Sequence, residues 1–227
     1  MTHVSDQRKK ESDAFALRCL FDWEDNALPL GEKNFPTTVV SRLHAVVPSL
    51  LHGRLLDVGC GVGRSSFEFA RSCDEVVAIE RSAYAVLGAQ RLKESGMLRY
   101  QLPWEEKVRN ISLNTFGLNF ASKKVNFWKA DLSTLRESFG NFDLISLFDP
   151  DIRVLQSRLK ERLKQKGAVV VTSAYTPQSA LSPERLGSIF SETFRCIYRG
   201  EIEMTQQTAS RNYNYARMEM TIWEKEA

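Results

Sequence analysis

The stretch LLDVGCGVGRSS, residues 55–66, has the composition of a buried strand, a glycine turn and the start of a helix. Leu55, Leu56 and Val58 are apolar, which is typical of a strand covered on both faces in a parallel sheet. The glycines that follow permit a tight turn in which the backbone approaches a ligand closely. The start of the helix would offer free N–H groups that suit a carboxylate or a phosphate. The stretch therefore predicts a ligand-binding loop.

The composition of the whole chain limits the classes of protein to which it can belong. The 227 residues suffice for one α/β domain, and 43% hydrophobic and 26% charged residues are typical of a globular protein. A net charge of +3 is too small to indicate a nucleic-acid partner, and no apolar run is long enough to cross a membrane. The chain begins with polar residues and shows no secretory signal. Its four cysteines are scattered, so we expect neither disulfides nor a metal site and predict a cytoplasmic protein.

Strands and helices alternate on both sides of the glycine loop. This order predicts one α/β domain, residues 1–227, with a mostly parallel sheet and helices on both faces. The last two strands have no helix between them, so the final strand is expected to be antiparallel. The expected strands are residues 54–58, 75–80, 125–130, 142–148, 168–174, 194–203 and 213–223. The expected helices within this series are residues 64–72, 83–95, 152–165 and 182–191.

Three further segments lie outside this alternation. Residues 13–23 and 36–51 predict two leading helices, the second interrupted near Pro48, that would cap the ligand site. Residues 1–12 are polar, and we expect a disordered tail. Residues 97–123 form a long aromatic insert, which we expect to carry small elements of its own and to line the substrate site.

The spacing of the glycines argues against two common nucleotide classes. A dinucleotide fingerprint that starts at Gly59 would need a small sixth residue, and that residue is Arg64. The Gly-Lys-Ser/Thr ending of a P-loop is also missing. The pattern is D-x-G-x-G-x-G, from Asp57 to Gly63.

Two acids follow later strands. Glu80 ends residues 75–80, where its oxygens could accept hydrogen bonds from a ribose diol, or it could be an exposed acid at a strand end. Asp131 follows residues 125–130, where it could accept from an adenine amine, but a helix N-cap is at least as consistent.

Together these motifs resemble the S-adenosylmethionine site of class I methyltransferases. The resemblance implies a Rossmann-like fold with a seven-stranded sheet and S-adenosyl-L-methionine as the cofactor. It implies the methionyl group at the glycine loop, the ribose at Glu80 and the adenine at Asp131. The residues implied to bind the cofactor are Asp57, Gly59, Cys60, Gly61, Gly63, Arg64, Ser65, Glu80, Arg81, Ala130, Asp131, Leu132 and Phe148.

Several motifs that are typical of other methyltransferases are missing, which narrows the range of substrate classes. No N/D-P-P-Y/F/W follows residues 142–148, and no cysteine is placed there to attack a pyrimidine ring. The double-glutamate loop of arginine methyltransferases, a metal cluster for catechols and a basic arm with aromatics are also missing. We therefore expect a small-molecule substrate and neither a nucleic-acid nor a membrane partner.

A narrower resemblance is carried by GCGVGRSSFEFAR, residues 59–71. This run is similar to the ovothiol-type methyltransferase module of the 5-thiohistidine (mercaptohistidine) synthase family. DAFALRCLFDW with a following NFP, ERSAYA, Tyr100 after Gly96, TSAYT and the closing TIW match the same family, over residues 12–224. The resemblance implies methylation of an imidazole ring nitrogen of a 5-thiohistidine-like amino acid or its selenium analogue. It also implies a functional partnership with a separate iron-dependent sulfoxide synthase.

The substrate-facing motifs depart from the family pattern. SLFDPDIRVL is shortened, Pro177 replaces a tryptophan, and TASR at residues 208–211 lacks an acid. The implied substrate contacts are Asp149, Tyr175, Arg211, Tyr213 and Tyr100. Arg211 could instead be a surface charge, and the tyrosines at 175 and 213 could be core residues. Methylation of another small molecule or a tRNA, and a non-catalytic binding module, remain as alternatives.

Overall fold

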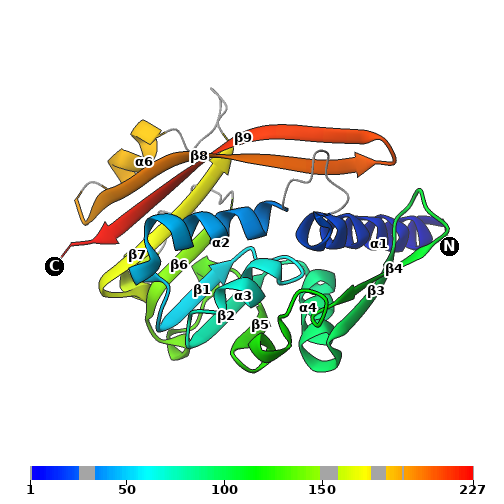
Figure 1. Cartoon of the computed structure of the whole chain (residues 1–227), viewed down its shortest axis with the longest axis horizontal. Helices are drawn as coiled ribbons and strands as arrows, with labels where there is room; N and C mark the ends of the chain where they lie inside the picture. Colours follow the sequence, from blue (N-terminus) through cyan, green and yellow to red (C-terminus); the bar gives the residue numbers. More distant parts are fainter. Residues whose placement is uncertain (1, 26–33, 149–157, 175–182, 191, 227) are drawn as a thin grey trace.

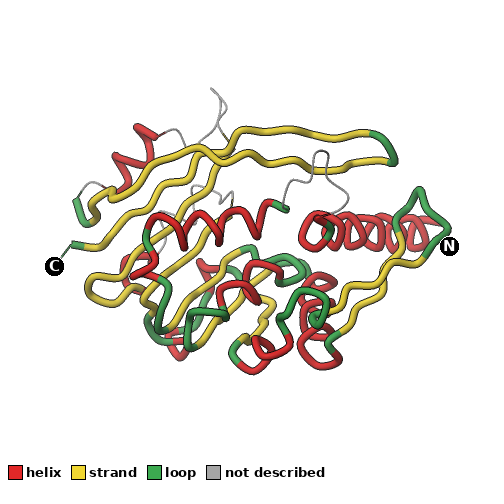
Figure 2. Tube along the Cα trace, in the orientation of Figure 1, coloured by secondary structure: helices red, strands yellow, loops and turns green. Residues whose placement is uncertain are grey.

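A seven-stranded sheet forms the centre of the computed structural model, which describes residues 2–25, 34–148, 158–174, 183–190 and 192–226. The strand order is β5-β2-β1-β6-β7-β9-β8, and helices cover both faces (Figures 1 and 2). The strands are β1 (Arg54–Val58), β2 (Glu75–Glu80), β5 (Val125–Lys129), β6 (Phe142–Phe148), β7 (Leu163–Ala174), β8 (Phe194–Ala209) and β9 (Asn212–Lys225).

The sheet is parallel except at its C-terminal end. β1 pairs in parallel with β2 and with β6, and β9 is antiparallel to both β7 and β8. The mostly parallel sheet with an antiparallel final strand is confirmed. From β1 the chain moves to β2 on one side and later to β6 on the other, which creates a crevice at the carboxyl end of β1.

Each face of the sheet has its own hydrophobic core. One core includes side chains of α1 (Thr2–Trp23), α2 (Phe35–Val46), α3 (Arg64–Phe69) and α4 (Ala83–Ser95). The other is covered by α6 (Pro183–Phe190) and by short 3-10 turns. The short turns of the chain are η3 (Pro48–Leu50), η4 (Asn119–Lys123), η5 (Leu132–Thr134), η6 (Glu137–Phe139) and η7 (Arg158–Arg162). None of the helices in the described part of the chain is both long and apolar enough to span a bilayer.

Two expected elements need correction. Residues 2–12 are not a disordered tail, because α1 begins at Thr2. Residues 6–10 are exposed, and Gln7 donates to Glu11 one turn later. The helix expected over residues 152–165 does not reach residue 165, because β7 begins at Leu163, which pairs with Phe142. The remainder of that expected helix up to residue 157 lies outside the described residues.

The insert and the last hairpin both extend from the body of the molecule (Figure 1). Within residues 97–123, β3 (Met97–Gln101) and β4 (Val108–Ser112) form a separate antiparallel pair, so the insert carries its own elements as expected. In the last hairpin, residues 203–217 lie beyond the part of β9 that pairs with β7. We call residues 203–217 the arm; it passes over α1 in Figure 1.

Candidate functional site

The glycine loop follows β1 at the centre of the crevice. Gly59, Gly61 and Gly63 have positive φ values of 78°, 56° and 90°, which side chains rarely adopt. A Cβ atom on Gly61 would collide with the guanidinium of Arg18, and one on Gly63 would lie 2.7 Å from the Phe127 ring. Gly61 and Gly63 therefore have two reasons to be glycine: the positive φ of the turn, and a neighbouring side chain that leaves no room for a Cβ atom.

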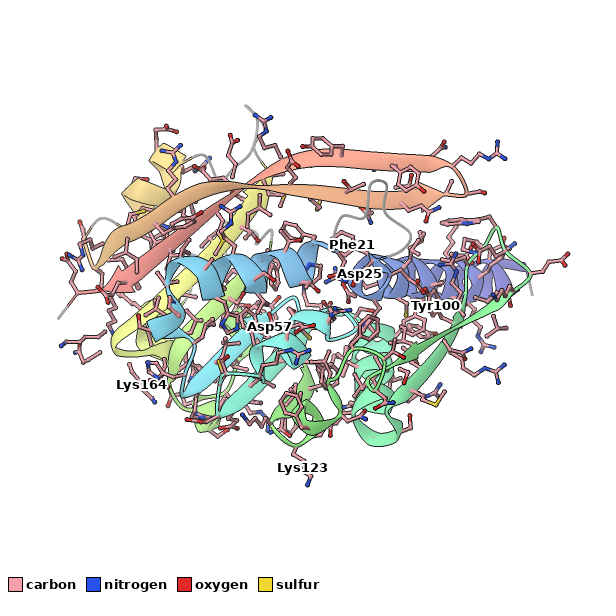
Figure 3. The ribbon with its side chains drawn as sticks, viewed as in Figure 1. Phe21, Asp25, Asp57, Tyr100, Lys123 and Lys164 are labelled. Carbon is pink, nitrogen blue, oxygen red and sulfur yellow. The ribbon has the colours of Figure 1, made fainter. Side chains whose placement is uncertain are left out.

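Asp57, labelled in Figure 3, connects the end of β1 to the helix that follows the loop. Its carboxylate is fully buried and accepts hydrogen bonds from the hydroxyls of Ser65, at 2.7 Å, and Ser66, at 2.6 Å. Burial raises the pKa of Asp57 to about 6, and the two hydroxyls oppose that rise. These contacts join the end of β1 to the first turn of α3. Asp57 and Ser65 therefore support the loop.

Helix α1 contacts the loop directly. Arg18 donates to the carbonyl oxygen of Gly59 at 3.1 Å, and Asp22 accepts from the Val62 N–H at 2.6 Å. Arg18 and Asp22 also form an ion pair of 3.0 Å. Trp23 donates its indole N–H to Val62 O at 3.2 Å. The leading helix therefore lies against the glycine loop, the position expected of a cap.

Arg18 and Asp22 were not predicted as site residues from the sequence. The available signal was an i, i+4 pair of opposite charge within the expected helix 13–23. Such pairs usually lie on a solvated face, but the Asp22 side chain is only 1% exposed. Burial raises its pKa, while the Arg18 charge and the Val62 N–H act in the opposite direction.

The N–H groups of the glycine turn, residues 59–63, are already engaged within the protein. Each N–H from residue 59 to residue 63 donates to an acceptor within the protein. The acceptors are Ile79 O for residues 59 and 60, Glu80 for Gly61, Asp22 for Val62 and Cys60 O for Gly63. Helix α3 has only six residues, so its dipole is short. The Arg18 side chain, 37% exposed, is thus a cation available to an anionic group beside the loop.

Glu80 lies at the carboxyl end of β2 and faces the loop. One carboxylate oxygen accepts from the Gly61 N–H at 3.2 Å and the other from the Ser82 N–H at 2.8 Å. Each oxygen of a carboxylate can accept a second hydrogen bond. The half-buried Glu80 therefore remains able to accept from a diol.

The residues after β5 form a turn near this acid. Asp131 caps η5 by accepting from the Ser133 N–H at 2.9 Å, so the N-cap alternative is confirmed. Arg81 is exposed, and its guanidinium lies 3.7 Å from an Asp131 oxygen. Ala130 is half-buried and Leu132 is buried beside them.

Arg64 was expected to bind the cofactor, but its side chain packs between two other segments of the chain. Its guanidinium is buried between the rings of Trp23, at 5.1 Å, and Phe116, at 4.2 Å, and it donates to Glu68 at 3.0 Å. Arg64 therefore joins α3 to α1 and to the insert. Cys60 is also buried.

Of the five expected substrate residues, the structure describes three, and these come from two separate elements, the insert and the arm. Tyr100 is buried and donates its hydroxyl to Glu24 at 2.7 Å, which fixes the insert to the end of α1. Arg211 and Tyr213 are exposed at the turn between β8 and β9, so neither is a core residue. Phe148, at the end of β6, packs against Phe35. The candidate residues Asp149 and Tyr175 lie outside the described residues.

The fold and the loop define a nucleotide-binding α/β protein of the methyltransferase type, and the comparisons agree. The family model described as "Methyltransferase domain" matches residues 56–171, about half of the chain. The chain belongs to this family. It is an S-adenosylmethionine-dependent methyltransferase.

Solved structures with the same fold span nearly the whole chain. The N-methyltransferase NodS of Bradyrhizobium japonicum, in complex with S-adenosyl-L-homocysteine, is 15% identical, with 96% of this chain and 99% of that chain covered and a TM-score of 0.60. Magnesium protoporphyrin IX methyltransferase of Synechocystis, with bound S-adenosylmethionine, is 17% identical, with 98% and 96% covered and a TM-score of 0.59. At such identities the likeness shows the fold alone. A search of curated proteins finds no match.

Proposed function

We propose that this methyltransferase methylates an imidazole ring nitrogen of a 5-thiohistidine-like amino acid or its selenium analogue, as in ovothiol biosynthesis. An iron-dependent sulfoxide synthase would supply this substrate. The proposal rests on the sequence resemblance over residues 12–224, and in particular on the run GRSSFEFAR, residues 63–71.

The observation that carries the proposal is that two matching segments, residues 13–23 and 59–71, contact each other and are joined to the insert. Within this run, Arg64 packs between Trp23 of the leading helix and Phe116 of the insert. Arg71, in the same run, donates to Phe116 O at 2.8 Å. Tyr100 of the insert in turn binds Glu24. The resemblance therefore describes one connected arrangement of helix, loop and insert.

The residues around the loop fit the cofactor. We propose that the Arg18 guanidinium binds the methionyl carboxylate, because it is a partly exposed cation beside Gly59 and Gly61. Glu80 would accept from the ribose hydroxyls with its remaining lone pairs. Asp131, with Arg81 beside it, would face the adenine edge. Arg64 and Asp57 would act by supporting the loop.

The chemistry requires little from the protein besides positioning. Bound S-adenosylmethionine supplies an electrophilic methyl group on a sulfonium. An imidazole with a pKa near ~6.5 has a free lone pair at neutral pH, so no general base is required. Holding the ring nitrogen in line can contribute roughly 7–11 kcal/mol. Because α1 lies on the loop, its Arg18–Asp22 pair would help to exclude water from the reacting groups.

The direct test is product analysis. The purified enzyme is incubated with S-adenosylmethionine and 5-thiohistidine, and the product is examined by mass spectrometry and NMR. We expect a mass gain of one methyl group and a shift of the resonances of one ring nitrogen. Parallel reactions contain histidine, selenohistidine or tRNA in place of the thiohistidine.

The parallel reactions separate the alternatives. No methylated thiohistidine or selenohistidine, together with turnover of histidine or tRNA, would contradict the proposed substrate. Methylation on sulfur instead of a ring nitrogen would contradict the proposed position. The Glu80→Ala variant is the matched control. If it loses activity, the measured turnover comes from the cofactor site of this chain and not from a contaminating enzyme.

A further inference from the structure

A cavity lies on the sheet face opposite α1–α4. It has a volume of about 600 Å³ and lies over β2 and β5. The connection from β5 to β6 contains the two short turns η5 and η6 between residues 130 and 141. Over β6 and β7, by contrast, Leu186 and Phe190 of α6 belong to the core on this face. The short turns thus leave a hollow beside the edge strand.

The described lining of this cavity contains none of the residues that form or hold the glycine loop. Its wall includes Arg54 and Glu75, which lie at the amino ends of β1 and β2. Asp57 and Glu80 lie at or near the carboxyl ends of the same strands and are not among its lining residues. A ligand in this cavity would therefore leave the glycine loop free.

The wall carries an excess of positive charge. Its described lining includes the basic residues Arg54, Lys129 and Arg136 and the acid Glu75. Glu75 is already paired with Arg54 at 2.6 Å. The charges of Lys129 and Arg136, both exposed, therefore remain for an anion. Arg136 suits a phosphate in particular, because its planar guanidinium can donate two parallel hydrogen bonds.

An aromatic surface lies beside these cations. The side chain of Trp128 is 50% exposed, although it borders a cavity. Phe139 meets it edge-on at 5.5 Å and 89°, which holds the indole in place. A flat ring system could stack on the exposed indole, and stacking of bases on aromatic side chains tolerates any base. Ser138 and Asn126 add polar groups to the same wall.

The edge of β5 is poorly suited to pairing with another strand. Gln90 donates to the carbonyl oxygen of Phe127 at 3.2 Å, and Lys93 donates to the side chain of Asn126 at 2.9 Å. Side chains from α4 thus occupy polar groups along the edge, which disfavours pairing with a second copy of the chain. The cavity is therefore better suited to a small ligand.

From the stacking surface and the cations together, we propose that this cavity binds a nucleoside monophosphate. The base stacks on Trp128, and the phosphate binds Arg136 and Lys129. The volume lies within the usual range for small-molecule sites, roughly 300–1,000 Å³. The ligand binds at the same time as S-adenosylmethionine, because among the described lining residues only Ala130 is also expected to contact the cofactor, and none holds the glycine loop.

The test is a calorimetric titration of adenosine 5′-monophosphate into the enzyme saturated with S-adenosylhomocysteine. Saturation closes the cofactor site to the nucleotide. We expect binding at one site, weakened about tenfold or more by Trp128→Ala and to a similar degree by Arg136→Gln. Inorganic phosphate should bind much more weakly, because it has no base to stack.

The matched control is Lys123→Gln, which removes the same charge from a lysine that points into solvent in Figure 3. It should leave nucleotide binding unchanged. Unchanged affinity of all variants for S-adenosylhomocysteine shows that they are folded. Absence of nucleotide binding to the saturated enzyme would overturn the proposal. So would binding unaffected by both cavity variants, or phosphate binding as tight as that of the nucleotide.

Discussion

The glycine loop and the arm differ in how their polar side chains are held. At the loop, Asp57 and Asp22 are buried and accept hydrogen bonds from neighbouring groups of the loop and α3. On the arm, Arg211 is exposed and Tyr213 is 42% exposed. The outer strands of the arm pair only with each other among the described residues, since β7 ends opposite Met218. The loop is therefore fixed by buried polar contacts, whereas the side chains at the arm tip are exposed.

Under the proposed function, in which the loop holds the cofactor and the arm contacts the substrate, this difference would separate the two tasks. A cofactor shared by a whole family needs one geometry, and a buried network preserves it because each unsatisfied group would be costly. A substrate contact can change more easily where side chains are exposed. The motifs of this chain follow that division, since the departures from the ovothiol-type pattern fall at residues 149–156 and 208–211 and not in the loop.

The largest effect is expected from the Asp22→Ala variant. The change leaves the Val62 N–H without its acceptor and Arg18 without its ion pair. Breaking a buried pair costs about 3–5 kcal/mol, and the partial exposure of Arg18 favours the lower end. Urea denaturation measures the free energy of unfolding. Asp6→Ala, at an exposed site on the same helix, is the control, and equal losses in both variants would contradict the buried role of Asp22.

A pH effect on stability follows from Asp57. Its pKa is raised to about 6 in the folded protein, above the value of about 3.9 for an unfolded chain. The folded state therefore holds more protons between these values, and stability falls as the pH rises through this window. The slope from this group reaches at most about 1.4 kcal/mol per pH unit.

The Asp57→Asn variant isolates this contribution. The free energy of unfolding is measured from pH 4 to pH 7. In the wild type it should fall with rising pH because Asp57 loses its proton, and this contribution should be missing in the variant. Other groups titrate equally in both proteins, so the difference between the two curves reports on residue 57. Parallel curves would mean that Asp57 is not raised in pKa.

The Glu80→Ala variant tests the cofactor side of the comparison. Loss of a charge-assisted hydrogen bond costs about 1.5–3 kcal/mol, so the affinity for S-adenosylmethionine should fall about 10- to 100-fold. Calorimetric titration gives the dissociation constant. Glu94→Ala, an exposed acid on α4, serves as the control. Equal affinity of wild type and the Glu80 variant would refute the ribose assignment.

The smallest effect on the cofactor is expected from Arg211→Ala. Because the residue is exposed at the arm tip, stability and cofactor affinity should change by less than about 0.5 kcal/mol. Steady-state kinetics then show whether the KM for the amino acid rises on its own. A clear loss of cofactor binding would show that the arm and the loop are not separate in function.

The central sheet could be predicted because its signals are local. β1 and the positive-φ glycines follow from apolar runs and glycine spacing within residues 54–63. The N-cap by Asp131 was also visible as an alternative, since it needs only Ser133 two residues later.

The contacts between distant segments could not be predicted in the same way. Arg18 and Asp22 read as a solvated helix pair until the fold brings α1 onto a loop about 40 residues away in the chain, a separation that the Asp22–Val62 bond shows directly. Arg64 was assigned to the ligand because of its place in the loop, but rings from two other segments enclose it. Periodicity reports which residues are buried but not against which partner.

The most direct test of the account is a calorimetric titration of S-adenosylmethionine into the wild-type enzyme and the Arg18→Gln variant. The account predicts one cofactor per chain in the wild type. It also predicts a loss of about tenfold or more in the variant, because a charged partner of the carboxylate is removed. No binding to the wild type, or equal affinity in both proteins, would contradict a cofactor held between the glycine loop and α1.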